Sequence, residues 1–184
     1  MPDERLLIAG CKQEKMWARK KLYELYAPAM LSLCVRYVGN RETARDILQD
    51  GFIKIFTKID GYAGMGSFEG WMRRIFVTTA LEHLRANRIS KDYIENYSES
   101  IEDIETSVLE KISADELLKC IADLPEGFRT IFNLYAIEGY SHAEIAGMLN
   151  IKESTSRSQF ARARQVLQKN VQSIILHDNA RRKK

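Results

Sequence analysis

Arginines recur along the stretch from Ser141 to Lys169 in positions that could bind a polyanion. Arg157, Arg162 and Arg164 all fall in its second half. Cationic side chains that project from one helix can neutralise phosphates, and a helix that enters the major groove of DNA needs this chemistry. The alternative is an amphipathic helical hairpin whose basic face is merely solvated.

The elements that would carry these arginines are two short helices around a tight turn. An S-x-x-E capping box begins at Ser141, so the first helix should start at His142. Asn150 tolerates the left-handed backbone that ends such a helix, and Ser154 or Thr155 can cap the second helix. The buried side of the second helix is expected to hold Phe160, Ala163 and Leu167. The stretch therefore predicts a helix-turn-helix.

A second group of arginines is interleaved with aromatic rings on a helix predicted over residues 68–88. Rings stack on unpaired bases while arginines hold phosphates, so this mixture suits single-stranded nucleic acid. The rings could instead be core aromatics beneath a solvated cationic rim. The residues in question are Phe68, Trp71, Phe76, Arg73, Arg74, Arg85 and Arg88.

A third candidate surface lies on a helix predicted over residues 41–59, which Asn40 can cap. Its apolar positions recur at three- and four-residue steps, and they leave an outward side with carboxylate and amide groups. That outward side holds Asp46, Gln49, Asp50 and Lys54.

The composition predicts a soluble all-α protein. The 184 residues include only 3 Pro and 10 Gly, which favours long helices, and no run alternates as a strand would. No apolar run approaches the roughly 20 residues of a membrane span, so we expect a cytoplasmic protein without membrane insertion. The 3 Cys are odd in number and lack C-x-x-C spacing, which argues against disulfides, zinc or another metal site, and no cofactor is expected.

The charge distribution predicts two bodies and a linker. Lys and Arg are in excess over residues 1–90 and again over 152–184, whereas Asp and Glu are in excess over 91–116. We therefore expect a helical domain at 1–90, a flexible acidic linker at 91–106, a second helical domain at 107–175 and a basic tail at 176–184. Further helices are expected over 3–13, 17–38 (bent or split at Pro28), 107–124 and 126–137. The glycine-rich segment 61–71 lacks the G-K-[ST] of a phosphate loop and is expected to be a connection.

Two regions resemble the bacterial sigma factors of the extracytoplasmic-function class, the small two-domain members of the main sigma family. ARDILQDGFIKIFTKI (44–59) resembles the family's D-x-x-Q-[ED]-x-F segment, and FEGWMRRIFVTTALEHLRANR (68–88) resembles its W-L-x-R-I-A-x-N-x-A-x-D-x-x-R segment. Residues 124–167 resemble the family's carboxy-terminal pattern almost position by position. The resemblance covers nearly the whole chain.

The resemblance implies a non-enzymatic protein that recruits core RNA polymerase to a promoter and helps to open it. Asp46, Gln49 and Asp50 would face the polymerase, for which exposed acids are suited because they attract a basic partner. Family behaviour also implies an anti-sigma factor as a partner. The residues implied at the melted minus-10 element are Trp71, Arg73, Arg74, Thr78, Arg85 and Arg88. The residues implied at the double-stranded minus-35 element are Lys152, Ser154, Thr155, Arg157, Ser158, Gln159, Arg162 and Arg164.

The sequence departs from the family pattern at several positions. Thr78 stands where Asn is frequent, Asn150 where Gly is usual, Ser156 where Val is common and Gln159 where Arg is common. The recognition helix is thereby more polar than in its relatives, so the minus-35 sequence is not transferable. We hypothesise that Gln159 reads an adenine through two hydrogen bonds.

Two other classes of protein compete with this interpretation. A different two-domain transcription regulator would carry an effector-binding domain, with an apolar pocket or a phosphoacceptor Asp after a strand, and no strand pattern is present. An all-helical enzyme would need Asp46 and Asp50 to bind metal, yet His83, His142 and His177 do not lie at ligand spacing to them.

Overall fold

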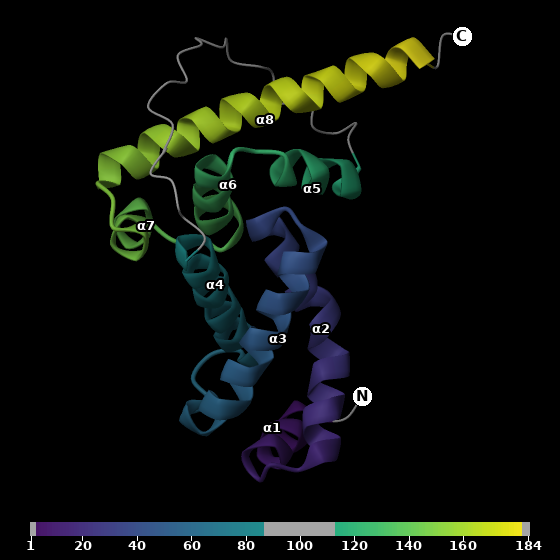
Figure 1. The fold of residues 1–184 in the computed structure, drawn as a ribbon, viewed down its shortest axis with the longest axis vertical. Coiled ribbons are helices and arrows are strands. Elements are labelled where there is room, and N and C mark those ends of the chain that lie inside the picture. Colours follow the sequence, from purple (N-terminus) through teal and green to yellow (C-terminus); the bar gives the residue numbers. More distant parts are fainter. Residues whose placement is uncertain (1–2, 87–112, 182–184) are drawn as a thin grey trace. The chain divides into compact units, whose positions relative to one another are not determined.

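The chain forms two helical units, seen in a computed structural model that describes residues 3–86 and 113–181, with side chains up to Ile175. The units divide the chain at Met1–Ile89 and Ser90–Lys184 (Figure 1). Every regular element among the described residues is helical, as the all-α prediction requires. The predicted linker and the start of the second predicted domain, at 107–112, lie outside the described residues. None of the described helices combines the length and apolar character needed to cross a membrane.

The first unit consists of α1 (Glu4–Lys12), α2 (Met16–Val38), α3 (Arg41–Lys58), a 3₁₀ turn η1 (Ile59–Gly61) and α4 (Phe68–Ala86). These bounds lie close to the predicted ones. Pro28 stays inside one continuous α2, so the helix is not split there. Asn40 caps α3 as predicted, because its Oδ1 accepts hydrogen bonds from the backbone N–H groups of Glu42 (2.7 Å) and Thr43 (3.2 Å).

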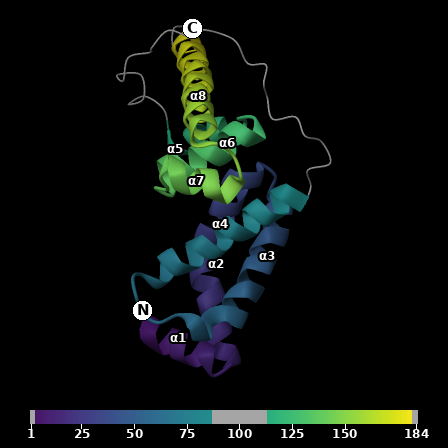
Figure 2. The same cartoon turned by 90° about the vertical axis from the view of Figure 1, so that its left-hand side faces the viewer.

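The core of the first unit is the contact among α2, α3 and α4, which pack against one another (Figure 2). Apolar side chains from all three helices are removed from solvent there, including Leu22, Leu33, Ile47, Ile55 and Phe76. At Gly51 the backbone of α3 lies directly on the ring of Phe76 from α4. A Cβ atom at Gly51 would stand 2.1 Å from the Phe76 Cε1 atom, so only glycine fits.

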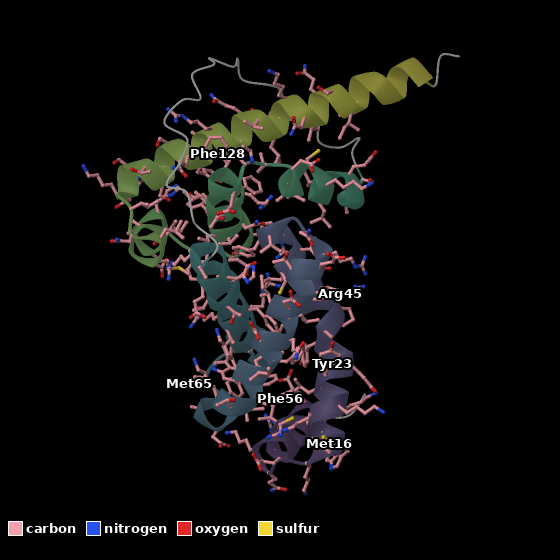
Figure 3. The ribbon with its side chains drawn as sticks, viewed as in Figure 1. Met16, Tyr23, Arg45, Phe56, Met65 and Phe128 are labelled. Atoms are coloured by element: carbon pink, nitrogen blue, oxygen red, sulfur yellow. The ribbon has the colours of Figure 1, made fainter. Side chains whose placement is uncertain are left out.

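The second unit consists of α5 (Ala114–Ala122), α6 (Glu126–Phe132), a π-helical turn η3 (Asn133–Ile137), α7 (His142–Leu149) and α8 (Glu153–Arg181). Its core lies where α5 and α6 pack on the long α8, around the fully buried Phe128, which Figure 3 labels. The other members of this core are Cys120, Ile121, Leu124, Ala163, Leu167 and Val171. All three cysteines of the chain are buried and unpaired, consistent with the absence of a disulfide framework.

The helix-turn-helix is present at the predicted residues, with one corrected boundary. Ser141 and Glu144 form the full capping box, and α7 begins at His142. Asn150 ends α7 in the left-handed conformation, with φ 54° and ψ 50°. The second helix begins at Glu153, so neither Ser154 nor Thr155 is its cap; the Ser156 N–H already donates to the Lys152 carbonyl oxygen (3.1 Å).

The long helix α8 continues past residue 175 to Arg181 and so includes the first residues of the predicted basic tail. Tyr135, which lies in the π-helical turn η3, is 40% exposed. The π-helical turn adds a residue to the helical repeat, which shifts the face on which the following side chains lie.

The Gly51 contact yields a stability prediction. Gly51→Ala should lower the free energy of unfolding of the first unit by about 1–3 kcal/mol, because the overpacking cost exceeds the roughly 1 kcal/mol that alanine gains in a helix. Gly61→Ala is the matched control, since no atom lies within 4 Å of its added Cβ. Thermal unfolding of both variants checks this, and equal midpoints would contradict the close contact.

Candidate nucleic-acid interface

A pocket of about 400 Å³ opens between α3 and α4 in the first unit. Three of the residues expected at single-stranded DNA line it together: Trp71, Arg74 and Thr78. Two cations on the opposite wall, Lys54 and Lys58 of α3, were not predicted at this site; Lys54 was expected only on the outward side of its helix. Their four-residue spacing places them on one helix face, which is the signal that could have found them. The remaining lining residues are Ile75, Thr79 and Glu82.

The Trp71 ring is held from behind by two other aromatic rings. It stacks on Phe68 at 5.5 Å between centroids, with 22° between the planes, and it meets Tyr62 at 5.5 Å. The side chain is half-buried, so part of the indole remains open on the pocket side. Such an arrangement presents an oriented aromatic surface on which a base can stack.

Ion pairs adjust the charge of this region. Lys54 binds Glu82 across the pocket and so joins α3 to α4. Arg73 lies 4.0 Å from Glu69 on its own helix, and the Thr78 hydroxyl donates to the Arg74 carbonyl oxygen at 2.8 Å. Because Lys54 neutralises the carboxylate of Glu82, the charges of Lys58 and Arg74 remain, and the pocket carries a net positive charge.

The remaining candidates on α4 lie beyond this pocket or outside the described structure. Arg85 is exposed in the last turn of α4 and does not line the pocket. Arg88 lies outside the described residues. The pocket therefore brings together only part of the predicted set.

A separate face of α3 carries the residues predicted to meet a basic partner. Asp46, Gln49 and Asp50 are all exposed, and their three- and four-residue spacing puts them side by side. Ile53, one turn further along this face, is 56% exposed. The face thus joins two carboxylates to an apolar side chain.

In the helix-turn-helix, most of the predicted DNA-contacting side chains face outward. Lys152, Ser154, Arg157, Ser158 and Arg164 are exposed, whereas Thr155 and Arg162 are half-buried. On α8 the exposed positions recur at three- and four-residue steps, as a helix laid in a groove requires. Arg157 donates from Nε to the Glu153 Oε1 atom at 3.1 Å, so its charge is partly compensated in the free protein.

Gln159 does not lie with this outward set. Its side chain is 6% exposed, and Ser156 is fully buried, because both fall on the helix face that includes Ala163. The Ser156 hydroxyl instead pairs with Nδ1 of His142 at 2.9 Å, joining α8 to α7. The free protein therefore does not present Gln159 to a base edge.

Two family profiles match this chain. The family profile described as Sigma-70 region 2 matches residues 22–89, and the one described as Sigma-70, region 4 matches residues 114–167. Each profile falls on one of the two helical units, in the order of the family. The chain thus carries sigma-70 region 2 followed by sigma-70 region 4. It is a sigma factor, which binds core RNA polymerase and directs promoter recognition and the initiation of transcription.

Individual relatives agree with this assignment of the sigma factor. The ECF RNA polymerase sigma-E factor of Haemophilus influenzae is 29% identical over 94% of this chain and 97% of its own length. The RNA polymerase sigma-H factor of Pseudomonas aeruginosa is 29% identical over 82% of this chain and 84% of its own. The fold is similar to that of the sigma factor RpoE of Bartonella quintana, solved with the anti-sigma factor NepR, at a TM-score of 0.52 and 20% identity over 83% of this chain and 96% of that one.

The buried polar pair in the sigma factor's helix-turn-helix is covered by aromatic rings. His142 stacks on Tyr135 at 4.2 Å, with 10° between the planes, and Phe160 meets it edge-on at 5.8 Å. Burial lowers the pKa of His142, and the nearby Arg157 lowers it further, against a smaller opposing effect of Glu153. The imidazole is therefore neutral at pH 7.

The buried position of Gln159 predicts that its amide does not read DNA. Its Oε1 atom has no hydrogen-bond partner among the described residues, and an unsatisfied buried acceptor costs about 1–3 kcal/mol. Gln159→Leu should therefore raise the free energy of unfolding by about 1 kcal/mol and leave promoter preference unchanged. In contrast, Arg164→Ala should weaken duplex binding and reduce the slope of log affinity against log salt by about 1. For Gln159, the contradicting result is a promoter selection in which Gln159→Leu changes the preferred minus-35 sequence. That result would show that the amide turns outward on DNA.

The lowered pKa of His142 predicts a loss of stability in acid. The unfolded chain binds the proton more readily than the folded chain, so stability is complete above the unfolded pKa of about 6.5 and falls as the pH drops below it. Urea unfolding between about pH 5 and pH 7.5 should show this loss in the natural chain. The double variant His142→Phe with Ser156→Ala keeps a ring and leaves no orphaned hydroxyl, so it should lose less stability over the same range. If the free energy of unfolding depended on pH identically in the natural chain and the double variant, His142 would not be the source of the loss in acid.

Proposed function

We propose that this sigma factor is of the extracytoplasmic-function class and reads promoters at two points, with region 2 on the melted minus-10 strand and region 4 on the minus-35 duplex. The observation that carries the proposal is the double character of α3. One of its faces is acidic and exposed, while another contributes Lys54 and Lys58 to the pocket of Trp71. A single helix can therefore bind polymerase with one face and DNA with the neighbouring face.

The proposed polymerase-binding face consists of Asp46, Gln49 and Asp50. Exposed carboxylates attract a basic surface over distance, and this attraction mainly accelerates association. Ile53 supplies apolar area on the same face, which stabilises the complex once it has formed.

The proposed minus-10 site is the pocket between α3 and α4. Trp71 would stack on a base of the displaced strand, while Arg74 and Lys58 bind its phosphates. Thr78 lines the same pocket, and its hydroxyl oxygen is available to accept a hydrogen bond, because its proton is donated to the Arg74 carbonyl oxygen. Arg73, Arg85 and Arg88 remain proposed phosphate contacts outside the pocket.

The proposed minus-35 site is the outward face of the first turns of α8. Cations there would bind phosphates and set the register, and hydroxyl groups would reach base edges. The set comprises Lys152, Ser154, Thr155, Arg157, Ser158, Arg162 and Arg164.

Regulation and place of action follow by analogy with the relatives. The Bartonella protein of similar fold was solved with an anti-sigma factor, which supports such a partner for this chain. We place its action in the cytoplasm, where polymerase meets the chromosome. We assign the chain no catalysis of its own, since polymerase performs the chemistry, and neither metal nor cofactor enters the proposal.

The test is reconstitution with core polymerase. Asp46→Arg combined with Asp50→Arg should reduce core binding at least tenfold, because two attractive charges become repulsive ones. Glu24→Arg is the matched control, since it changes an exposed carboxylate on α2, outside this face. Binding to core, followed by promoter selection and transcription, provides the readout. The proposal would be contradicted if the double variant bound core polymerase as tightly as the natural chain, or if transcription showed no promoter preference.

A further inference from the structure

A side chain of α1 contacts the backbone that follows the end of α3. The Lys12 ammonium of α1 donates to the carbonyl oxygens of Tyr62 (3.0 Å) and Asp60 (3.4 Å). These carbonyls lie in and just after η1, where the helical path of α3 ends. The last carbonyls of a helical segment lack partners within it and carry partial negative charge, so a cation there is favourable. Lys12 thus caps this end from a different part of the chain.

A second contact fastens α1 to α2. The Tyr26 hydroxyl donates to the Glu4 Oε2 atom at 2.7 Å. Burial, together with this hydrogen bond, raises the pKa of Tyr26, so the phenol keeps its proton and remains a donor. The Tyr26 ring also meets Phe68, at 6.1 Å and nearly perpendicular.

Both contacts lead to Trp71 through one intermediate ring each. Lys12 holds the backbone of Tyr62, and Tyr26 packs against Phe68; the rings of Tyr62 and Phe68 are the two that support the indole. These two rings also meet each other, at 5.1 Å. The aromatic support behind Trp71 is therefore anchored from both sides by side chains that do not touch the pocket.

The same contacts fix the base of the loop before α4. The Tyr62 hydroxyl donates to the Gly66 carbonyl oxygen at 2.9 Å, across a loop in which Gly64 and Gly66 have positive φ. Met65 at the tip is 86% exposed (Figure 3). The loop is thus held where it leaves η1 and where it enters α4, and its tip is open to solvent.

We propose that Lys12 and Tyr26 are positioning residues for promoter opening, which act by holding Tyr62, Phe68 and hence Trp71 in the orientation that captures the melted strand. This inference rests on the proposed minus-10 site. A pre-oriented indole spares the ordering cost that a mobile ring would incur on binding. Holding the Trp71 ring therefore favours strand capture and promoter opening, and it leaves core binding and minus-35 binding unchanged.

The test uses full-length chains in holoenzyme. Lys12→Met and Tyr26→Phe should each weaken binding of a single-stranded minus-10 oligonucleotide about three- to tenfold and slow opening of a fluorescent promoter by a similar factor. Affinity for core polymerase and for a minus-35 duplex should stay within twofold of the natural chain. Lys12→Arg should restore opening, because it can still donate to both carbonyls, and Lys20→Met, an exposed change on α2, is the control.

A direct readout of the indole separates positioning from general destabilisation. In a Trp17→Phe background Trp71 is the remaining tryptophan, and its fluorescence anisotropy should fall in Lys12→Met at a temperature where the chain is folded. Unchanged anisotropy and opening in both variants would overturn the inference, as would an equal loss of core and minus-35 binding. If Trp71→Ala itself leaves strand capture intact, the proposed minus-10 site fails instead, which is a distinguishable result.

Discussion

The close approach of α3 and α4 at Gly51 is the constraint on which the first unit depends. With the Phe76 ring against a bare backbone, the two helices lie near enough for Lys54 to reach Glu82 and for both helices to line one pocket. A larger residue at position 51 would move the helices apart and separate the lysines from Trp71. Packing, rather than charge, therefore decides whether the cations and the indole act together.

Within that frame α3 carries opposite charges on two of its faces. The acidic residues, proposed to attract polymerase, would repel DNA if they lined the pocket, whereas the lysines would repel a basic polymerase surface. Lys54 follows Asp50 by four residues and so borders the acidic face, whereas Lys58, twelve residues after Asp46, points about 120° away from it. One helix can thus present opposite charges to two partners, with Asp50 and Lys54 at the border between the two faces.

Much of the fold followed from local signals in the sequence. Asn40, Ser141 and Asn150 each marked a helix end that the structure confirms, because capping depends on neighbouring residues only. The pocket did not follow, since Lys54 and Lys58 approach Trp71 only after α3 packs on α4. Gln159 was expected at a base edge by resemblance to the family, whereas its four-residue spacing from Ala163 indicates the buried side, on which it lies in the free protein. In this helix the periodicity was the better guide.

The pairing of Arg157 with Glu153 bears on how the protein moves along DNA. In the proposed minus-35 complex Arg157 gives up its carboxylate partner when it binds a phosphate, and Glu153 then remains close to the polyanion. This electrostatic penalty would apply at every DNA site, and only sites with favourable base contacts would offset it. Brief encounters with random sequence would therefore end sooner, which shortens the time spent on the many competing sites of a genome.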